Sequence, residues 1–229
     1  MLALENSSMC GSVALVAPDH CLAEYSLTSA TTHSQRLLCS IQQLMQETGV
    51  GWEQIDAIAV SDGPGSFTGL RIGLATAKGL AMATGKPLLT VTSTRTLACQ
   101  LAWTTQLICP VLDARKREVY TALYRGDGLG GEPKRVSDIV AIAPEALAEG
   151  MGEEEVLFMG DGSRIYRDIL QERMGSRASF ASSEIFFIRA AALGHAALAK
   201  WRRAEFCDTA TAIPDYIRPS EAEINLGKG

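Results

Sequence analysis

One loop of the sequence combines residue types that could bind a phosphate group. Between Asp62 and Gly69, glycines and hydroxyl side chains stand directly before a predicted helix, and the unpaired amide groups at the start of a helix attract anions. The loop lacks the Gly-Lys-Ser/Thr ending of a Walker A motif, and its lysine, Lys78, comes too late in the sequence to reach a phosphate. We therefore regard the loop as a weak match to a nucleotide-binding motif.

Two other positions carry candidate catalytic groups. Asp113 follows a predicted strand, where a catalytic carboxylate can stand. Aspartate also forms turns by accepting hydrogen bonds from its own backbone, and we favour the turn. Gly160-Asp161-Gly162 is an isolated Gly-x-Gly pattern, which is a weak signal. A stand-alone ATPase or a peptidase-like hydrolase that uses these residues is the alternative hypothesis for function.

The histidines and cysteines indicate neither a metal site nor a catalytic triad. His20, His33 and His195 are isolated, and no group of histidine and acidic residues has the spacing of metal ligands. There is no Gly-x-Ser-x-Gly turn, and we do not favour a Ser-His-Asp triad. The six cysteines form no Cys-x-x-Cys pair, and several lie in apolar runs, which is typical of reduced, buried thiols. We predict no catalytic, metal-binding or cofactor-binding residue in this chain alone.

The composition is that of a soluble globular protein. With 229 residues, the chain has the length of one large or two small domains. Its net charge of -5 argues against a surface that binds nucleic acid unaided, because neutralising phosphates requires clustered lysine and arginine. The first residues lack the pattern of a signal peptide, and no apolar run reaches membrane-spanning length. We expect a cytoplasmic protein with no membrane contact.

A tight turn and a long helix must position the loop. Gly63-Pro64-Gly65 predicts the turn, and the Ser66 hydroxyl can cap the start of the helix. Small residues then recur every four positions: Gly65, Gly69, Gly73, Ala77, Ala81 and Gly85. Because glycine inside a helix costs about 1 kcal/mol relative to alanine, we expect close packing against a neighbouring backbone to offset that cost.

The other sides of this helix are also apolar. Arg71 and Lys78 are its only charged residues. Large apolar side chains surround the rest of the axis: Phe67, Leu70, Ile72, Leu74, Leu80 and Met82. A helix that is apolar nearly all round is normally buried on most sides. The pattern therefore predicts that a second domain or a second protein covers it.

Before this helix, the sequence predicts a β-meander and an amphipathic helix. Strands are expected at residues 2–5, 12–16 and 22–27. Thr32–Gln35 matches a capping box for a helix that stops at Gly49. One stripe of this helix is apolar: Leu37, Leu38, Ile41, Leu44 and Met45. The opposite side is rich in glutamine and poor in charge, so it is either a solvated polar face or a partner surface.

The remaining elements alternate between strands and helices. In the first part of the chain we expect strands at 55–60 and 88–92 and a short helix at 94–103. In a second cycle we expect strands at 107–112, 118–124 and 156–159, and helices at 144–149, after Gly162 and at 184–201. This order indicates mixed sheets with helices packed on their faces.

We divide the chain accordingly. Residues 1–103 form an N-terminal α/β domain, and residues 104–203 form a second α/β domain. The tail, residues 204–229, is expected to dock back on the body of the protein.

The glycine-rich loop and the start of its helix resemble a family signature. Residues 62–73 read DGPGSFTGLRIG, which strongly resembles the GPGSFTGLRIG signature of the TsaB (YeaZ) family. The motif residues are Asp62, Gly63, Pro64, Gly65, Ser66, Phe67, Thr68 and Arg71. Further stretches resemble the same family in the same order: Leu4–Ser7 with Ser12–Leu15, His33–Ser34 with Leu37–Leu38, Asp113–Tyr120 and Pro214–Arg218. Family members usually begin with an IDTS-like run, whereas this chain has Glu5-Asn6-Ser7.

The resemblance implies a two-domain actin-like, Hsp70-like (ASKHA) α/β fold. It also implies a role in making threonylcarbamoyladenosine next to the anticodon of tRNA. In that family the chain is not itself the transferase but pairs with the catalytic subunit TsaD, and the small ATPase TsaE joins them. This implies that no cofactor binds this chain alone, that ATP is used by the assembled complex, and that tRNA is met only through the complex.

Our leading hypothesis is therefore a non-catalytic subunit that binds a TsaD-like partner through its first two helices, residues 34–48 and 66–84. The predicted partner-binding residues are Leu37, Leu38, Ile41, Leu44, Met45, Gly65, Gly69, Leu70, Gly73, Leu74, Ala77 and Ala81. When the partner is absent, the same surface could form a homodimer, for which a self-complementary contact is natural.

Overall fold

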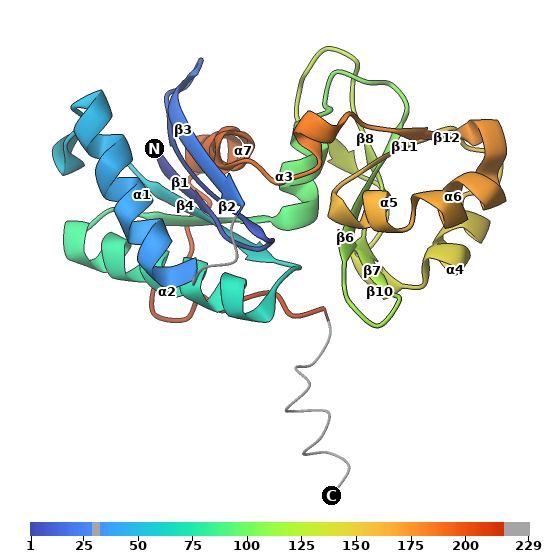
Figure 1. Ribbon diagram of the computed structural model, residues 1–229. Coiled ribbons are helices and arrows are strands. Elements are labelled where there is room, and N and C mark those ends of the chain that lie inside the picture. Colours follow the sequence, from blue (N-terminus) through green and yellow to red (C-terminus); the bar gives the residue numbers. More distant parts are fainter. Residues whose placement is uncertain (29–32, 218–229) are drawn as a thin grey trace, which may run out of the picture.

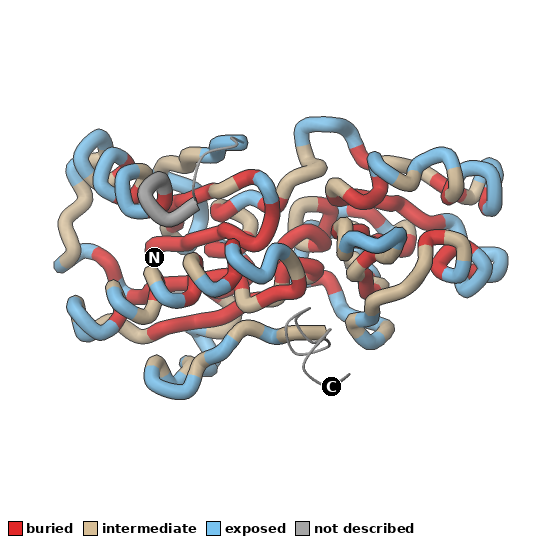
Figure 2. Tube along the Cα trace, turned by 60° about the horizontal axis from the view of Figure 1, so that its bottom comes forward, coloured by how far each residue is buried: buried red, intermediate tan, exposed pale blue. Residues whose placement is uncertain are grey.

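The structure of the protein is a computed structural model that describes residues 1–28 and 33–217, with the side chains of 33–36 left out. The predicted capping box at Thr32–Gln35 and the tail beyond residue 217 lie outside this description. Two lobes stand side by side, each built on one sheet (Figure 1). Buried segments run through the middle of both lobes (Figure 2).

The first lobe is built on a mixed sheet. Its elements, in chain order, are β1 (Leu2–Glu5), β2 (Cys10–Val16), β3 (Cys21–Thr28), α1 (His33–Thr48), a 3-10 turn at Trp52–Gln54, β4 (Ile58–Gly63), α2 (Phe67–Thr84) and β5 (Leu88–Thr92). The strand order is β3-β2-β1-β4-β5. The meander β1–β2–β3 is antiparallel, as predicted, and β4 pairs parallel with β1 and with β5. The carboxyl ends of β1 and β4 therefore meet at one edge of the sheet.

Alternation along the strands gives this sheet two different faces. On β1, Leu2 and Leu4 pack beneath α1 and α2, whereas Ala3 points to the opposite face. That opposite face is covered by α7 (Ala190–Arg202), the last helix of the chain. Small side chains allow α7 to approach closely, since a Cβ on Gly194 would lie 3.0 Å from the Cβ of Val16.

The position of α7 corrects the predicted domain boundary. Residues 104–203 do not form one unit, because α7 packs on the first sheet through its alanines and returns the chain to the N-terminal lobe. The helix also begins at Ala190 and not at Glu184, since residues 183–185 form a 3-10 turn.

The second lobe follows α3 (Ser93–Cys99), which packs between α7 and β6. Its elements are β6 (Leu107–Asp113), β7 (Val119–Thr121), β8 (Tyr124–Arg125), β9 (Lys134–Arg135), β10 (Val140–Ile142), α4 (Pro144–Glu149), β11 (Val156–Met159), α5 (Asp161–Ile165), α6 (Arg167–Met174), a 3-10 turn at Gly175–Arg177, and β12 (Ala178–Phe180). The strand order is β10-β7-β6-β11-β12; in addition, β8 pairs with β6, and β9 pairs with β8. The predicted strand 118–124 is thus divided into β7 and β8.

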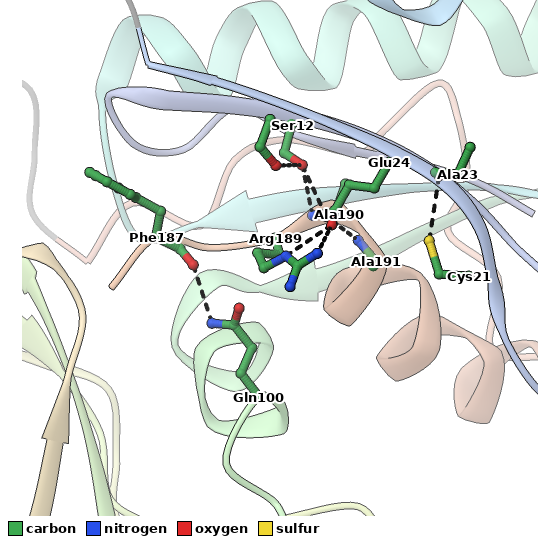
Figure 3. A network of polar contacts seen from close by, with 10 residues as sticks. Ser12, Cys21, Ala23, Glu24, Gln100, Phe187, Arg189, Ala190 and Ala191 are labelled. Carbon is green, nitrogen blue, oxygen red and sulfur yellow. Dashed lines mark hydrogen bonds and ion pairs between the residues drawn. The ribbon is translucent and has the colours of Figure 1, made fainter. Parts of the chain in front are cut away.

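The return from the second lobe to α7 is anchored by a polar network (Figure 3). The Glu24 carboxylate on β3 accepts hydrogen bonds from Arg189 Nε at 2.9 Å and from the Ala191 N–H at 2.9 Å. The Ser12 hydroxyl accepts the Ala190 N–H at 3.1 Å. Strands β2 and β3 therefore provide acceptors for the first amide groups of α7.

Residues 204–217 run along the first lobe after α7 (Figure 1). The Cys207 N–H bonds to the Leu88 carbonyl on β5 at 2.8 Å, and the Asp215 N–H bonds to the Asp62 carbonyl at 2.7 Å. Within the part of the chain described, no helix is long and apolar enough to cross a membrane.

Candidate functional site

A cleft of about 530 Å³ lies between the two lobes. One wall comes from the first lobe, with the turn after β1 (Ser7–Met9) and the start of α2. The other wall comes from the second lobe, with the loop after β6 and the start of α5. The tail segment 215–217 reaches the same cleft. The predicted motif loop therefore lies where the two lobes and the tail meet.

The structure confirms the local prediction for the motif loop. The Ser66 hydroxyl accepts the Gly69 N–H at 3.3 Å and caps α2. The Gly63 backbone has φ +127°, and a Cβ at this position would lie 2.7 Å from the Asp215 carbonyl oxygen. Glycine is needed here both for the left-handed backbone and for the close passage of the tail.

The glycine row of α2 meets this chain's own backbone. A Cβ on Gly69 would overlap the Asn6 carbonyl oxygen, and a Cβ on Gly65 would overlap that of Ser7. Gly73 faces the Asn6 side chain, whose amide donates to the Gly69 carbonyl at 2.9 Å. The turn after β1 thus lies in the space that the glycines leave. The prediction that this row accommodates a foreign helix is wrong, because the row is already filled from within.

Most of the other predicted partner-binding side chains are also buried inside the chain. They are Leu37, Ile41, Leu44, Leu70, Leu74, Ala77 and Ala81. Apart from Leu70, all of them belong to the core between the sheet and the two helices, and Met45 packs against that core. Only Leu38 has a largely exposed side chain, at 53%. Apart from Leu38, the apolar stripe of α1 therefore identified the side of the helix that packs into this core.

The outward side of α2 was not among the predicted partner-binding residues, although Ile72 and Met82 were recognised as apolar positions of this helix. Exposed residues there are Thr68, Ala75, Gly79, Met82 and Ala83, with Ile72 half-buried beside them. A Cβ on Gly79 would meet no atom within 4 Å. The available signal was a second row of small residues with a spacing of four, Ala75, Gly79 and Ala83, parallel to the row that we used.

Glu5, at the end of β1, is fully buried next to the turn that fills the glycine row. Its Oε1 accepts the Ser7 N–H at 2.6 Å and also the Ser7 hydroxyl. Burial raises the pKa of Glu5 to about 7, although the hydrogen bonds from Ser7 and Ser61 lower it. Its Oε2 has no hydrogen-bond partner among the described residues. Burial likewise raises the pKa of Asp62 at the end of β4.

The candidate catalytic residues of the second lobe have structural roles. Asp113 Oδ1 accepts the Arg115 N–H at 3.0 Å, which confirms the turn-forming interpretation. Asp161 Oδ1 accepts the Gly162 N–H at 2.8 Å and the Asp113 N–H at 3.2 Å, and burial raises the pKa of Asp161. A Cβ on Gly160 would overlap the Val111 carbonyl oxygen. The Gly-x-Gly pattern therefore allows α5 to pack on β6.

The two histidines whose side chains are described, His20 and His195, do not line the cleft. His20 Nδ1 lies 2.8 Å from Asp19 on the surface, and partial burial lowers the pKa of His195. Among the described side chains, those of residues 1–28 and 37–217, no group of three histidine, cysteine or acidic residues is arranged to hold a metal ion.

Similarity to known proteins extends over nearly the whole chain. The family model described as TsaD: tRNA N6-adenosine threonylcarbamoyltransferase matches residues 25–226. The tRNA threonylcarbamoyladenosine biosynthesis protein TsaB of Bacillus subtilis is 31% identical over 225 residues, which cover 97% of this chain and 96% of that protein. A Pseudomonas aeruginosa crystal structure, described as similar to peptidase YeaZ, has a TM-score of 0.81 and 30% identity, covering 95% of this chain and 98% of that one.

The fold itself is shared more widely. Component A of the (R)-2-hydroxyglutaryl-CoA dehydratase from Acidaminococcus fermentans has a TM-score of 0.52 at 9% identity, covering 90% of this chain and 98% of that one. The chain has the two-lobed actin-like, Hsp70-like (ASKHA) α/β fold that was predicted. With the glycine-rich loop in place between the lobes and relatives matched along nearly its full length, the chain belongs to the TsaB (YeaZ) family of tRNA threonylcarbamoyladenosine biosynthesis proteins.

Proposed function

We propose that this chain is the non-catalytic subunit of the complex that makes threonylcarbamoyladenosine next to the anticodon of tRNA. It binds the TsaD-like transferase subunit through the outward sides of α1 and α2. A TsaE-like ATPase joins the pair, the assembled complex uses ATP, and tRNA contacts this chain only through the complex.

The observation that carries the proposal is an exposed, uncharged surface on these two helices. We define the docking face as the exposed or half-exposed residues Leu38, Ile72, Ala75, Gly79, Met82 and Ala83. Met82 is 73% exposed, and the small residues beside it would let another helix come close. Gly79 costs its helix about 1 kcal/mol, and no contact to the Gly79 position within the described chain offsets that cost.

The surroundings of Glu5 support the non-catalytic part of the proposal. The Glu5 carboxylate is removed from solvent and bonded to Ser7, and the Asn6–Ser7 turn fills the groove along the glycine row. The residues on which an ATPase or a peptidase-like hydrolase would depend instead form turns and packing contacts, as at Asp113 and Gly160. Calorimetry of the isolated chain with ATP tests this part, and heat of binding with turnover would contradict it.

Substitution of Gly79 by leucine tests the docking face. Because the position is open, Gly79→Leu should fold at least as stably as the wild type, since leucine is the better helix former. Binding to the TsaD-like transferase should weaken about tenfold or more, because a bulky side chain holds the two helices apart. Ala146→Leu is the matched control, since Ala146 is exposed on α4 of the second lobe.

The binding is measured by calorimetry and by co-elution in size exclusion. A Gly79→Leu chain that binds the transferase with wild-type affinity would rule out this surface. Sedimentation of the isolated chain tests the homodimer, because Gly79→Leu should convert any dimer on the same face to monomer. An assay of tRNA modification by the transferase and the ATPase, with and without this chain, tests the activating role.

A further inference from the structure

Arg71 lies at the edge of the docking face with its guanidinium held in a fixed position. It is exposed on α2, one helical turn from Ala75, so the two residues share a side of the helix. Its Cζ lies 3.8 Å from the centroid of the Phe67 ring. Its Nε donates to the Tyr216 hydroxyl at 2.8 Å. A ring below and a hydroxyl at one edge therefore fix the plane of the guanidinium.

The tail holds Tyr216 in place for this contact. The rings of Tyr216 and Phe67 have centroids 5.2 Å apart. The neighbouring Asp215 N–H is bonded to the Asp62 carbonyl, and the tail backbone passes directly over Gly63. The two terminal Nη atoms of Arg71 have no ion pair or hydrogen bond within the described residues. They form a pre-organised fork whose geometry matches a carboxylate.

Within the described part of α1 and α2, the other charged side chains, Lys78 and Glu47, are already engaged. Lys78 Nζ donates to the carbonyl oxygens of Ala210 at 3.1 Å and Ala212 at 2.9 Å. Glu47 on α1 accepts the Tyr25 hydroxyl and the Gln43 side-chain amide. Arg71 is thus a single open cation at one end of an uncharged face, judged over the described part of α1 and α2. A single fixed charge on such a face favours a partner that places an opposite charge directly against it. Binding orientations that leave the charge unpaired are disfavoured.

We infer that Arg71 pairs with a carboxylate on the helix of the transferase subunit that docks here, and that Tyr216 is the residue that positions Arg71 for this contact. The inference rests on the proposed function. A protein carboxylate fits better than an RNA phosphate, because the docking face beside Arg71 contains no second cation and the chain carries a net charge of -5.

The test measures the affinity of this full-length chain for the TsaD-like transferase by calorimetry. Arg71→Gln should weaken binding about tenfold or more. Arg71→Lys should recover little of the lost affinity, because an ammonium group cannot form the bidentate pair that a guanidinium forms with a carboxylate. Tyr216→Phe keeps the ring and removes only the hydroxyl, so it should weaken binding less than Arg71→Gln. Arg202→Gln, on the exposed end of α7, is the matched loss of charge and should have no effect.

A double-mutant cycle separates positioning from a general structural effect. Tyr216→Phe should have no further effect in the Arg71→Gln chain, because there is then no guanidinium to position. Single Glu→Gln and Asp→Asn changes along the docking helix of the transferase should include one that is not additive with Arg71→Gln. Thermal unfolding of each variant shows that it is folded.

The outcomes are distinct. Failure of the wild-type chain to bind the transferase would overturn the proposed function, whereas equal binding by wild type and Arg71→Gln would overturn only this inference. Weakened binding of tRNA by the complex with unchanged binding of the transferase would assign Arg71 to RNA. Loss of the Arg71 effect in a Glu221→Gln, Glu223→Gln chain would assign the carboxylate to this chain's own tail. Either of the last two results also overturns the inference.

Discussion

Alanine substitution of three glycines in α2, one at a time, tests which sides of the helix the chain itself covers. Gly69 and Gly73 face the turn after β1, whereas Gly79 faces open space. A helix interior favours alanine over glycine by about 1 kcal/mol at each position. The variants therefore differ mainly in what the added methyl group meets, so each serves as a control for the others.

The structure predicts a different sign for each variant. Gly79→Ala should raise the free energy of unfolding by about 1 kcal/mol, since its methyl group meets no atom within 4 Å. Gly73→Ala should change it little, because the methyl group would lie 3.3 Å from Asn6 Cβ and a small shift offsets the gain. Gly69→Ala would overlap the Asn6 carbonyl and displace the Asn6 amide from the Gly69 carbonyl. Overpacking and the lost buried hydrogen bond should then give a net loss of roughly 2–4 kcal/mol.

Urea unfolding followed by circular dichroism measures these differences. The midpoint should rise for Gly79→Ala, stay near the wild-type value for Gly73→Ala and fall for Gly69→Ala, with a common slope against denaturant. If Gly69→Ala and Gly79→Ala were equally stable, the turn after β1 could not fill the glycine row. Our explanation of the family signature would then be refuted.

The remaining predictions concern polar side chains. Burial raises the pKa of Glu5 from 4.5 to about 7, so the unfolded chain loses this proton first. The resulting stability is fully present below pH 4.5 and falls by about 3 kcal/mol as the pH rises to about 7. Glu5→Gln should remove this fall in urea titrations at several pH values, and a persisting fall would exclude Glu5 as its source. Glu24→Ala should lower the free energy of unfolding by roughly 2 kcal/mol, because Arg189 and the Ala191 N–H lose their acceptor; a neutral result would show that the network in Figure 3 adds no stability. Ser66→Ala should lower it by about 1 kcal/mol through loss of the helix cap, measured by the same assay.

Local features of this protein followed from the sequence alone. The cap at Ser66, the end of α1 before Gly49 and the strands β5 and β11 agree with prediction. The helix cap and the helix end depend on backbone groups only a few positions apart, and the strands were recognised from short apolar runs between turn residues. The two-lobed fold was predicted through the resemblance of the glycine-rich loop and its companion stretches to a family signature. Asp113 was also assigned correctly, because an aspartate turn is closed by its immediate neighbours.

Only the tertiary structure determined which faces of the helices are buried and which segments cover them. The row of small residues from Gly65 to Ala81 predicts that another backbone segment packs closely against α2. The sequence alone does not show which segment that is. The neighbour is Asn6, whose side chain bonds to Gly69 across 63 positions of sequence. The same limit applies to α7, whose alanines could cover either sheet, and to the tail that engages Arg71 and Lys78. Periodicity shows that a helix has a face to bury, but the choice of partner depends on shape and backbone contacts between segments far apart in the chain.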